Sequence, residues 1–310
     1  MPSGRAVARS DRDEGSVARG ERALQARAPA KVNLGLRILG RRPDGLHELE
    51  SLFAPLDLAD ALELRISPAR ERTVALRDAG GTFASPGEPN LAVVAAEAFL
   101  ELAQLHLAVE IALAKHVPVA AGLGGGSSDA GAVLRTLAGH APGAVGVSEL
   151  RALARSLGAD VPFFLDPRPA RVRGSGERIE PFPGLPELAL LLVNPGWPLA
   201  TGDVYRAYDA LPAAAPPPPL PSLPAALADA EALAALLHND LEAAVRRLRP
   251  ELGALRSRLE ALRPLATGMS GSGPTLFGVF AGPEQAAAAL AEGGFEPPIW
   301  ARVARTREAG

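Results

Sequence analysis

The sequence predicts a two-domain protein of the α+β class, and three observations support this prediction. The chain has 310 residues, about twice the ~150 residues of a typical domain. Hydrophobic residues make up 47% of the chain and charged residues 22%, which is ordinary for a globular protein with a buried core. Patterns of strand period and of helix period alternate after a polar start. We therefore expect a disordered tail at 1–24, an N-terminal domain at 25–175 and a C-terminal domain at 176–310.

The tail mixes Arg, Asp, Glu, Ser and Gly without any apolar period, which is typical of disorder. After it, alternating apolar residues predict strands at 32–39, 47–53, 61–66 and 107–114. The segment Arg42–Gly45 has the Pro-x-Gly chemistry of a turn. Helical spacing predicts helices at 91–105, 128–137 and 148–158. We expect Asn90 and Ser148 to cap the first and third of these, and Gly158 to end the third.

The C-terminal domain continues this mixture with a strand at 188–193 and a short helix at 203–210. A proline run at 216–224 follows, and we expect it to be a surface loop of polyproline character. Beyond it the spacing predicts helices at 225–237, 241–262 and 284–291, and a glycine turn that leads into a strand within 268–280. A last strand near 300–304 is free, in this prediction, to return to the N-terminal domain.

Charge and composition exclude several classes of protein. The net charge of −3 and a pI near 6.0 argue against a nucleic-acid binder with a broad basic surface. Absence of cysteine excludes disulfides, thiolate metal sites and cysteine nucleophiles. No apolar run approaches the ~18 residues of a membrane span, and no apolar signal segment follows the tail. We therefore expect a cytoplasmic protein that has a small-molecule substrate and binds neither nucleic acid nor membrane.

The segment from Pro118 to Asp129, PVAAGLGGGSSD, is the most informative in the chain. Its four glycines and two serines stand between a predicted strand and a predicted helix. Backbone N–H groups at a helix start bind anions, and glycine lets a phosphate approach the backbone. The segment has neither the Gly-Lys-Ser/Thr of a Walker A loop nor the third glycine of a dinucleotide fingerprint. It predicts a phosphate cradle of another type, with a flexible turn as the alternative.

Only two of the 32 basic residues are lysines, Lys31 and Lys115. The Ala-, Arg- and Pro-rich composition indicates a drift that replaces lysine by arginine wherever a positive charge suffices, so these two lysines are candidates for specific roles. Lys115 stands directly before the glycine segment, where it could reach a phosphate. The alternative is a solvated charge at the end of a strand.

Lys31 and Asn33 point to one face of the first strand, because side chains alternate along a strand. Asp160 enters an apolar stretch, where a carboxylate is either paired or functional. Asp160 beside Lys31 would suit a general base that accepts a hydroxyl proton. The alternatives are a solvated edge strand for Lys31, and a structural salt bridge or turn for Asp160.

Two further glycine clusters occur outside the main segment. Met269–Pro274 precedes a predicted strand, and we expect it to close the site from the second domain. On its own such a cluster is more often a simple turn. Arg173–Glu177 is a weaker cluster, which we interpret as the connection of a hairpin.

Together these segments resemble the superfamily of galactokinase, homoserine kinase, mevalonate kinase and phosphomevalonate kinase. The glycine segment is typical of the superfamily. Asp-Gly-Leu-His at 44–47 and Gly-Ala-Asp-Val-Pro at 158–162 are typical, within it, of the 4-diphosphocytidyl-2-C-methyl-D-erythritol kinases. The similarity runs from about Ala28 to Ala304 and also rests on PAKVNL at 29–34, Asn90-Leu91, NDLE at 239–242 and MSGSGP at 269–274. It implies an N-terminal domain like domain 2 of ribosomal protein S5 and a ferredoxin-like C-terminal domain.

The resemblance implies a small-molecule kinase that uses ATP and Mg²⁺ to phosphorylate the 2-hydroxyl of a cytidine diphosphate-linked methylerythritol. Asp160 would be the base and Lys31 its charged partner. Residues implied in ATP binding are Pro118, Gly122, Leu123, Gly124, Gly125, Gly126, Ser127, Ser128, Asn90 and Lys115, and either serine, with Ser128 preferred, would be the protein ligand of the metal. Residues implied in substrate binding are Asn33, His47, Tyr205, Asp160, Gly271, Ser272 and Gly273, with His47 and Tyr205 at the cytosine.

Two positions depart from the family pattern. Leu46 stands where the family often has a tyrosine that stacks on cytosine, and such a stack is worth ~1–3 kcal/mol. Gly131 stands where alanine is usual, at an expected loss of about 1 kcal/mol of helix propensity. The alternatives to the cytidyl-sugar kinase are a homoserine or mevalonate type of kinase, a nucleotide-binding protein without catalysis, and an RNA-binding module of similar fold.

Overall fold

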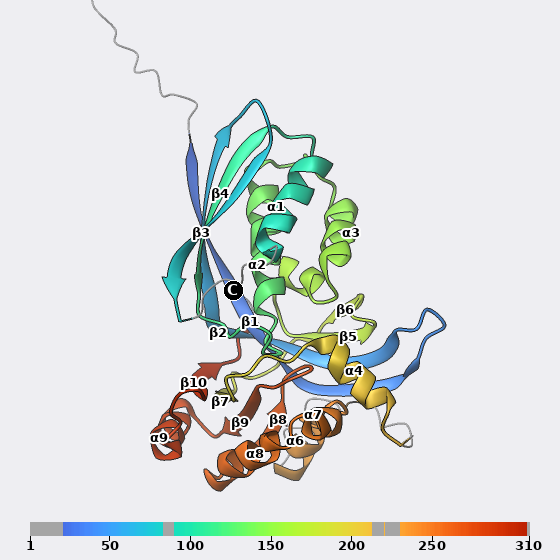
Figure 1. Ribbon diagram of the computed structural model, residues 1–310, viewed down its shortest axis with the longest axis vertical. Coiled ribbons are helices and arrows are strands. Elements are labelled where there is room, and N and C mark those ends of the chain that lie inside the picture. The colour runs from blue at the N-terminus through green and yellow to red at the C-terminus, as the bar shows by residue number, and fades with distance from the viewer. Residues whose placement is uncertain (1–20, 83–89, 213–219, 221–229, 309–310) are drawn as a thin grey trace, which may run out of the picture.

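The computed structural model describes residues 21–82, 90–212, 220 and 230–308, and its strands form two sheets (Figure 1). The first sheet has the order β3-β4-β2-β5-β6, with β1 paired to β2, and the second has the order β10-β7-β9-β8. Most of the tail expected at 1–24 lies outside the described residues. Its last residues do not fit that expectation, because β1 already begins at Arg22.

Two long antiparallel strands, β1 (Arg22–Arg41) and β2 (His47–Pro68), form the centre of the first sheet. The turn expected at Arg42–Gly45 connects them. The two strands predicted at 47–53 and 61–66 are one continuous strand, because most of the residues between them are apolar and the pairing with β1 continues through three register shifts. β4 (Leu107–Lys115) and β5 (Ala170–Gly174) flank β2, and β3 (Thr73–Gly81), which the sequence did not indicate, lies outside β4. β6 (Arg178–Pro181) pairs with β5, so the first sheet extends beyond residue 175.

Three helices cover the first sheet on one side in Figure 1: α1 (Leu91–Leu102), α2 (Gly125–His140) and α3 (Val147–Leu157). They share an apolar core with β2 and β4. The Asn90 cap is confirmed, since its side chain accepts the Ala92 N–H at 2.9 Å. The expected Ser148 cap is wrong, because α3 starts one residue earlier and the Glu149 carboxylate instead accepts the Gly146 N–H at 2.8 Å. α2 starts inside the glycine run, earlier than the predicted residue 128.

The second sheet contains β7 (Ala189–Asn194), β8 (Ala266–Met269), β9 (Leu276–Phe280) and β10 (Trp300–Arg305). Its chain order of fourth, first, third and second strand, all antiparallel, is that of a ferredoxin-like unit. A return of the last strand to the N-terminal domain is not what the structure shows, because β10 pairs with β7 along its whole length. The end of β10 still touches β2: the Arg305 N–H donates to Asp57 Oδ1 at 2.8 Å, and Thr306, directly after β10, makes an isolated bridge to Leu56.

The helices of the C-terminal part are α4 (Thr201–Asp209), α6 (Ala230–Leu236), α7 (Glu242–Leu248), α8 (Glu251–Ala261) and α9 (Pro283–Gly293). The single helix predicted at 241–262 is two helices, because Pro250 has no N–H to donate and interrupts the ladder of hydrogen bonds. Of the proline run at 216–224, only Leu220 belongs to the described part. It is buried, and its N–H donates to Glu50 at 3.0 Å.

One apolar core joins the two sheets. It contains Val32 and Leu34 of β1 and Leu56 of β2 on one side, with Leu190 of β7 and Phe277 of β9 on the other. The loops at this junction come from both parts of the chain, and the candidate site lies there. Within the described ranges, no helix has the length and apolar character needed to cross a membrane.

Candidate functional site

A cavity of about 880 Å³ lies at the junction of the two parts of the chain. Most of the residues that the sequence singles out line it: Lys31, Asn33, His47, Asn90, Lys115, Pro118, Gly122, Gly124, Gly125, Gly126, Ser127, Asp160, Tyr205, Gly271 and Ser272. Three others do not belong to its wall. Leu123 is packed in the apolar core, Ser128 is fully buried, and Gly273 lies behind Gly271 and Ser272.

The glycine segment forms the wall of this cavity at the start of α2. Gly124 precedes the helix with a φ of +71°, a conformation that favours glycine, and Gly125 to Ser127 form the first turn. Phe164 and Lys31 press on Gly124 from behind, since an added Cβ would lie 2.9 Å from the Phe164 ring and 3.2 Å from Lys31 Cε. The first N–H groups of α2 have no partner within the helix, and such groups suit the binding of phosphate.

The second glycine cluster, Met269–Pro274, packs directly on this loop. Ser270 Oγ donates to the Gly122 carbonyl at 2.9 Å and accepts the Asn33 N–H at 3.2 Å. Gly122 has no room for a side chain, because a Cβ there would lie 2.2 Å from the Ser270 carbonyl oxygen. Residues 269–274 therefore meet the glycine loop from the C-terminal part, where the sequence analysis expected them.

Lys31 lines the cavity, and its ammonium is held from several sides. It donates to Asn33 Oδ1 at 2.5 Å, lies 4.6 Å from the centre of the Phe53 ring, and is 3.4 Å from Asp160 Oδ2. Asn33 is fixed in turn because its amide donates to Ser51 Oγ at 2.9 Å. The solvated edge strand considered for Lys31 is thereby excluded, since the side chain is buried.

Asp160 precedes a short 3-10 helix, η1 (Val161–Leu165), whose apolar residues anchor the segment. Phe163 and Phe164 are buried against Phe53 in a small aromatic cluster. The Asp160 carboxylate makes no hydrogen bond to the first turn of η1, so it is not used as a helix cap. It is 30% exposed, faces the cavity and has the Lys31 ammonium beside it. The predicted proximity of these two residues is therefore observed.

Lys115 has surroundings that the sequence did not indicate. Its ammonium is buried between the carboxylates of Asp60 and Asp129, at 2.8 Å from Asp129 and in close contact with Asp60. The other oxygen of Asp60 accepts the N–H groups of His116 at 2.5 Å and Val117 at 2.8 Å. The solvated strand-end charge is therefore excluded, and this cluster ties β4, β2 and α2 together at the base of the glycine loop.

The charges of this cluster shift each other's pKa. Burial alone would lower the pKa of Lys115, but the carboxylates of Asp129 and Asp60 outweigh burial and raise it. Burial raises the pKa of Asp129 to about 7, opposed by Lys115 and reinforced by the negative charge of Asp60. Lys115 is thus a paired ammonium that lies under the loop, where its charge is already compensated.

Two oxygens at the start of α2 fit a metal ion carried by a nucleotide. Ser128 Oγ and Asp129 Oδ1 are buried and have no hydrogen-bond partner. Hydroxyl and carboxylate oxygens are ligands that Mg²⁺ prefers, and a buried polar atom without a partner is costly. In the described part of the chain, this region included, no group of three or more His, Cys, Asp or Glu side chains is placed to hold a metal ion.

Two lining residues that the resemblance assigns to the cytosine, His47 and Tyr205, contact each other. The rings of His47 and Tyr205 are stacked with centres 4.8 Å apart, and His47 Nε2 is 2.7 Å from Asp209 Oδ1. Burial raises the pKa of Tyr205 to about 12, with the negative charge of Asp160 adding to the effect. Tyr205 therefore stays neutral and can donate a hydrogen bond. Leu46, which also lines the cavity, is 52% exposed.

Several residues of the site were not indicated by the sequence analysis. Asp60 and Asp209 belong to no recognisable sequence motif. For Asp60 one signal was available, because it is an acidic residue within the mainly apolar pattern of β2. Phe53 and Ser270 contribute contacts that depend on long-range packing. The hairpin residues Ser175 and Gly176 also line the cavity, whereas the sequence analysis interpreted their segment only as a connection.

Comparison with known proteins agrees with this geometry. Residues 90–166 match the family described as GHMP kinases N terminal domain, and residues 222–295 match GHMP kinases C terminal. A 4-diphosphocytidyl-2-C-methyl-D-erythritol kinase of Anaeromyxobacter dehalogenans is 45% identical over 267 residues, which cover 82% of this chain and 80% of that protein. One from Thermus thermophilus is 44% identical over 264 residues, covering 85% and 90%.

Solved structures give the same result. A crystal structure of 4-(cytidine 5'-diphospho)-2C-methyl-D-erythritol kinase is 41% identical, with a TM-score of 0.74 over 92% of this chain and 100% of that one. A homoserine kinase from Cytophaga hutchinsonii, at 19% identity and a TM-score of 0.66 over 93% of this chain and 95% of that one, shares the fold. The resemblance and the fold class expected from the sequence are both confirmed. The chain belongs to the GHMP kinases and, among them, to the family of 4-diphosphocytidyl-2-C-methyl-D-erythritol kinases.

Proposed function

We propose that this chain transfers a phosphoryl group from ATP to the 2-hydroxyl of 4-diphosphocytidyl-2-C-methyl-D-erythritol, a step of non-mevalonate isoprenoid precursor synthesis. Its family membership supports the substrate, and one observation supports the chemistry. The cavity that contains the glycine loop at the start of α2 also contains a carboxylate, Asp160, with an ammonium 3.4 Å away. A phosphate cradle and a candidate base thus share one enclosure.

Asp160 would accept or orient the proton of the attacking hydroxyl. Its carboxylate is open to the cavity and is not used in helix capping, so it can accept a substrate hydroxyl while Oδ2 stays beside Lys31. Lys31 would orient this carboxylate and offset negative charge near the transferred group. Lys31 itself is held by Asn33 and by the face of Phe53, so we assign Asn33 to the positioning of Lys31 as well as to the substrate.

The phosphates would bind at the start of α2. The backbone N–H groups of Gly125 to Ser127, the Ser127 hydroxyl and the positive end of the helix dipole offset the charge of the triphosphate. Asp129, which lines the cavity, would hold the Mg²⁺ that accompanies ATP through its unpartnered Oδ1. The unpartnered Ser128 hydroxyl is buried outside the cavity wall, so it would have to turn toward the ion to serve as a second ligand. The ion supplies charge neutralisation in phosphoryl transfer. Catalysis would therefore consist mainly of positioning and charge stabilisation.

The cytidyl group would bind near Tyr205, His47 and Leu46. His47 and Tyr205 are already in contact, so the base would pack on the exposed side of this pair, against Leu46. We expect Leu46→Tyr to lower the KM for the cytidyl substrate by roughly tenfold, since a base stack contributes ~1–3 kcal/mol. The expected cytoplasmic location and the absence of nucleic-acid and membrane partners remain predictions.

The decisive experiment offers the purified protein MgATP with the cytidyl-sugar alcohol, homoserine or mevalonate in separate reactions. ADP release and a phosphorus NMR spectrum of the product report turnover and the site of transfer. We expect rapid turnover of the cytidyl-sugar alcohol alone. Turnover of homoserine or mevalonate instead would favour another kinase of the superfamily. ATP binding without turnover of any alcohol would favour a nucleotide-binding protein.

A further inference from the structure

The hairpin between β5 and β6 forms part of the cavity rim beside Asp160. Ser175 and Gly176, at its tip, line the cavity. Gly176 has a φ of +108° and lies on Ala159, since a Cβ there would be 3.2 Å from the Ala159 carbonyl oxygen. Ala159 is the residue before Asp160. The position of this hairpin therefore limits where the Asp160 segment can lie.

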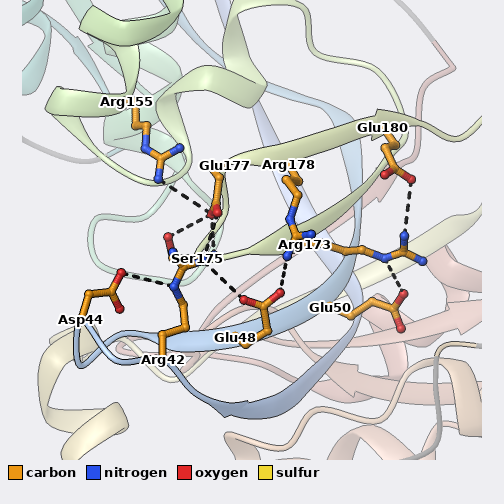
Figure 2. Close-up of polar contacts among 10 residues, drawn as sticks. All are labelled: Arg42, Asp44, Glu48, Glu50, Arg155, Arg173, Ser175, Glu177, Arg178 and Glu180. Carbon is orange, nitrogen blue, oxygen red and sulfur yellow. Dashed lines mark hydrogen bonds and ion pairs between the residues drawn. The ribbon is translucent and has the colours of Figure 1, made fainter.

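The Glu177 carboxylate organises the hairpin tip, although Glu177 is not itself in the cavity wall (Figure 2). One oxygen accepts the Ser175 N–H at 2.6 Å and the Ser175 hydroxyl at 3.0 Å. The same oxygen is 3.9 Å from the Arg155 guanidinium on α3. Burial alone would raise the pKa of Glu177, but these hydrogen bonds, its own backbone N–H and Arg42 lower it to about 2. The carboxylate is therefore ionised, and both of its oxygens are engaged in contacts within the protein.

The other oxygen of Glu177 connects the hairpin to a second rim loop. It accepts Arg42 Nη1 at 3.1 Å, and Arg42 also contacts Asp44 at 3.2 Å and Glu48 at 3.4 Å (Figure 2). The Arg42 backbone closes the turn that follows it, with an N–H donated to the Leu46 carbonyl at 2.8 Å. Gly45 and Leu46 of this turn line the cavity. Arg42 and Glu177 thus join the turn that carries Leu46 to the hairpin that supports Asp160.

We infer that Glu177 is a positioning residue that holds the turn Arg42–Leu46 and the Asp160 segment at a set separation on the substrate side of the cavity. This inference rests on the proposed function for its kinetic consequence. The nucleotide side is independent of Glu177, because the phosphate loop is held by Asp60, Lys115 and Ser270. Loss of Glu177 should therefore weaken the binding of the cytidyl-sugar alcohol and leave the binding of ATP unchanged.

The kinetic test compares Glu177→Gln with Glu180→Gln in the full-length protein. Glu180 is a matched control, because it lies in the same hairpin, is 59% exposed against 17% for Glu177, and has Arg173 at 3.6 Å. We expect Glu177→Gln to raise the KM for the cytidyl-sugar alcohol by roughly tenfold, because the turn Arg42–Leu46 and the Asp160 segment would no longer be held in place. The KM for ATP should change less than about twofold, and Glu180→Gln should match the wild type.

A double-mutant cycle and a measurement without substrate complete the test. Arg42→Gln should show the same selective KM effect, and the effects of the two substitutions should be less than additive in the double variant, because each of them removes the shared Arg42–Glu177 contact. Hydrogen exchange at residues 42–46 and 158–161 should be faster in Glu177→Gln than in Glu180→Gln, even if the wild type turns over no cytidyl-sugar alcohol. Equal KM changes for both substrates, additive effects, or unchanged exchange at both segments would each overturn the inference.

Discussion

The two lysines of the chain line one cavity, but their surroundings are opposite. Lys31 has one carboxylate beside it, Asp160, which is 30% exposed and 3.4 Å away. Lys115 has two, Asp60 and Asp129, which are buried and in direct hydrogen-bond contact. The chain contains no other lysine. The same residue type therefore serves an open, incompletely paired site and a closed, fully paired one.

This difference fits two separate tasks. We assign Lys31 and Asp160 to the positioning of the substrate, and Lys115 to the support of the glycine loop. A buried ion pair is expensive to break, because it leaves an uncompensated charge in the interior. Lys115 is thus suited to hold β4 and the first turn of α2. Asp160 keeps an open face toward the cavity, as its proposed role toward a substrate hydroxyl requires. The two regions also differ in what holds them: apolar packing of Phe163 and Phe164 holds the Asp160 segment, and charge holds the base of the phosphate loop.

The largest expected effect is on kcat and concerns Asp160, the partly exposed carboxylate beside Lys31. Asp160→Asn keeps the shape but cannot accept a proton, so kcat should fall by roughly 10²–10⁴-fold. ATP affinity, measured by calorimetry, should be unchanged, because the phosphate loop is intact. Asp166→Asn is a suitable control, since Asp166 follows η1 and pairs with Arg168 at the surface. A kcat near that of the wild type for Asp160→Asn would mean that Asp160 is not the base.

The next effect is on stability and concerns Lys115, the lysine buried between Asp60 and Asp129. Lys115→Met leaves two buried carboxylates without their cation, and it should lower the free energy of unfolding by about 3–5 kcal/mol. Lys31→Met should lower it by only about 1 kcal/mol, because Asp160 can be hydrated. Urea unfolding of both variants measures this contrast. Equal losses of stability would show that the two lysines do not differ in the way we describe.

Substitution by arginine sharpens the comparison further. Lys31 is confined between Gly124 and Gly271, where added Cβ atoms would lie 3.2 Å from its Cε and 3.3 Å from its Nζ. A planar guanidinium is wider than an ammonium, so Lys31→Arg should lower kcat by roughly 10–100-fold. Lys115→Arg should mainly lower the melting temperature. Full activity of Lys31→Arg would mean that only the positive charge matters at this position.

The smallest expected effect concerns the packing behind Asp160. A Cβ at Gly131 of α2 would lie 2.5 Å from Phe164 Cβ, so Gly131→Ala should destabilise the protein by about 1–2 kcal/mol despite its better helix propensity. Gly139→Ala, in the same helix with open space around it, should stabilise the protein slightly. Thermal unfolding of the pair tests this expectation. A more stable Gly131→Ala would show that Phe164 shifts easily.

Local patterns were sufficient to predict much of the fold. The Asn90 cap, the turn at Arg42–Gly45, the hairpin at Arg173–Glu177 and most strands follow from spacing and turn chemistry, which depend on neighbouring residues. The misplaced elements depend on distant ones. β2 is continuous because β1 pairs along its whole length, β3 forms beside β4, and β10 stays in the second sheet because β7 offers it an edge.

The candidate site divides in the same way. The sequence by itself indicated the glycine loop, because a glycine run at the start of a helix leaves free N–H groups whatever surrounds them, and it placed Lys31 and Asn33 on one face of a strand. Only the tertiary structure decided which carboxylate each lysine meets. Asp60 and Lys115 are 55 residues apart, and Arg42 and Glu177 are 135 apart. Contacts over such separations arise from sheet pairing and core packing, and no local pattern encodes them.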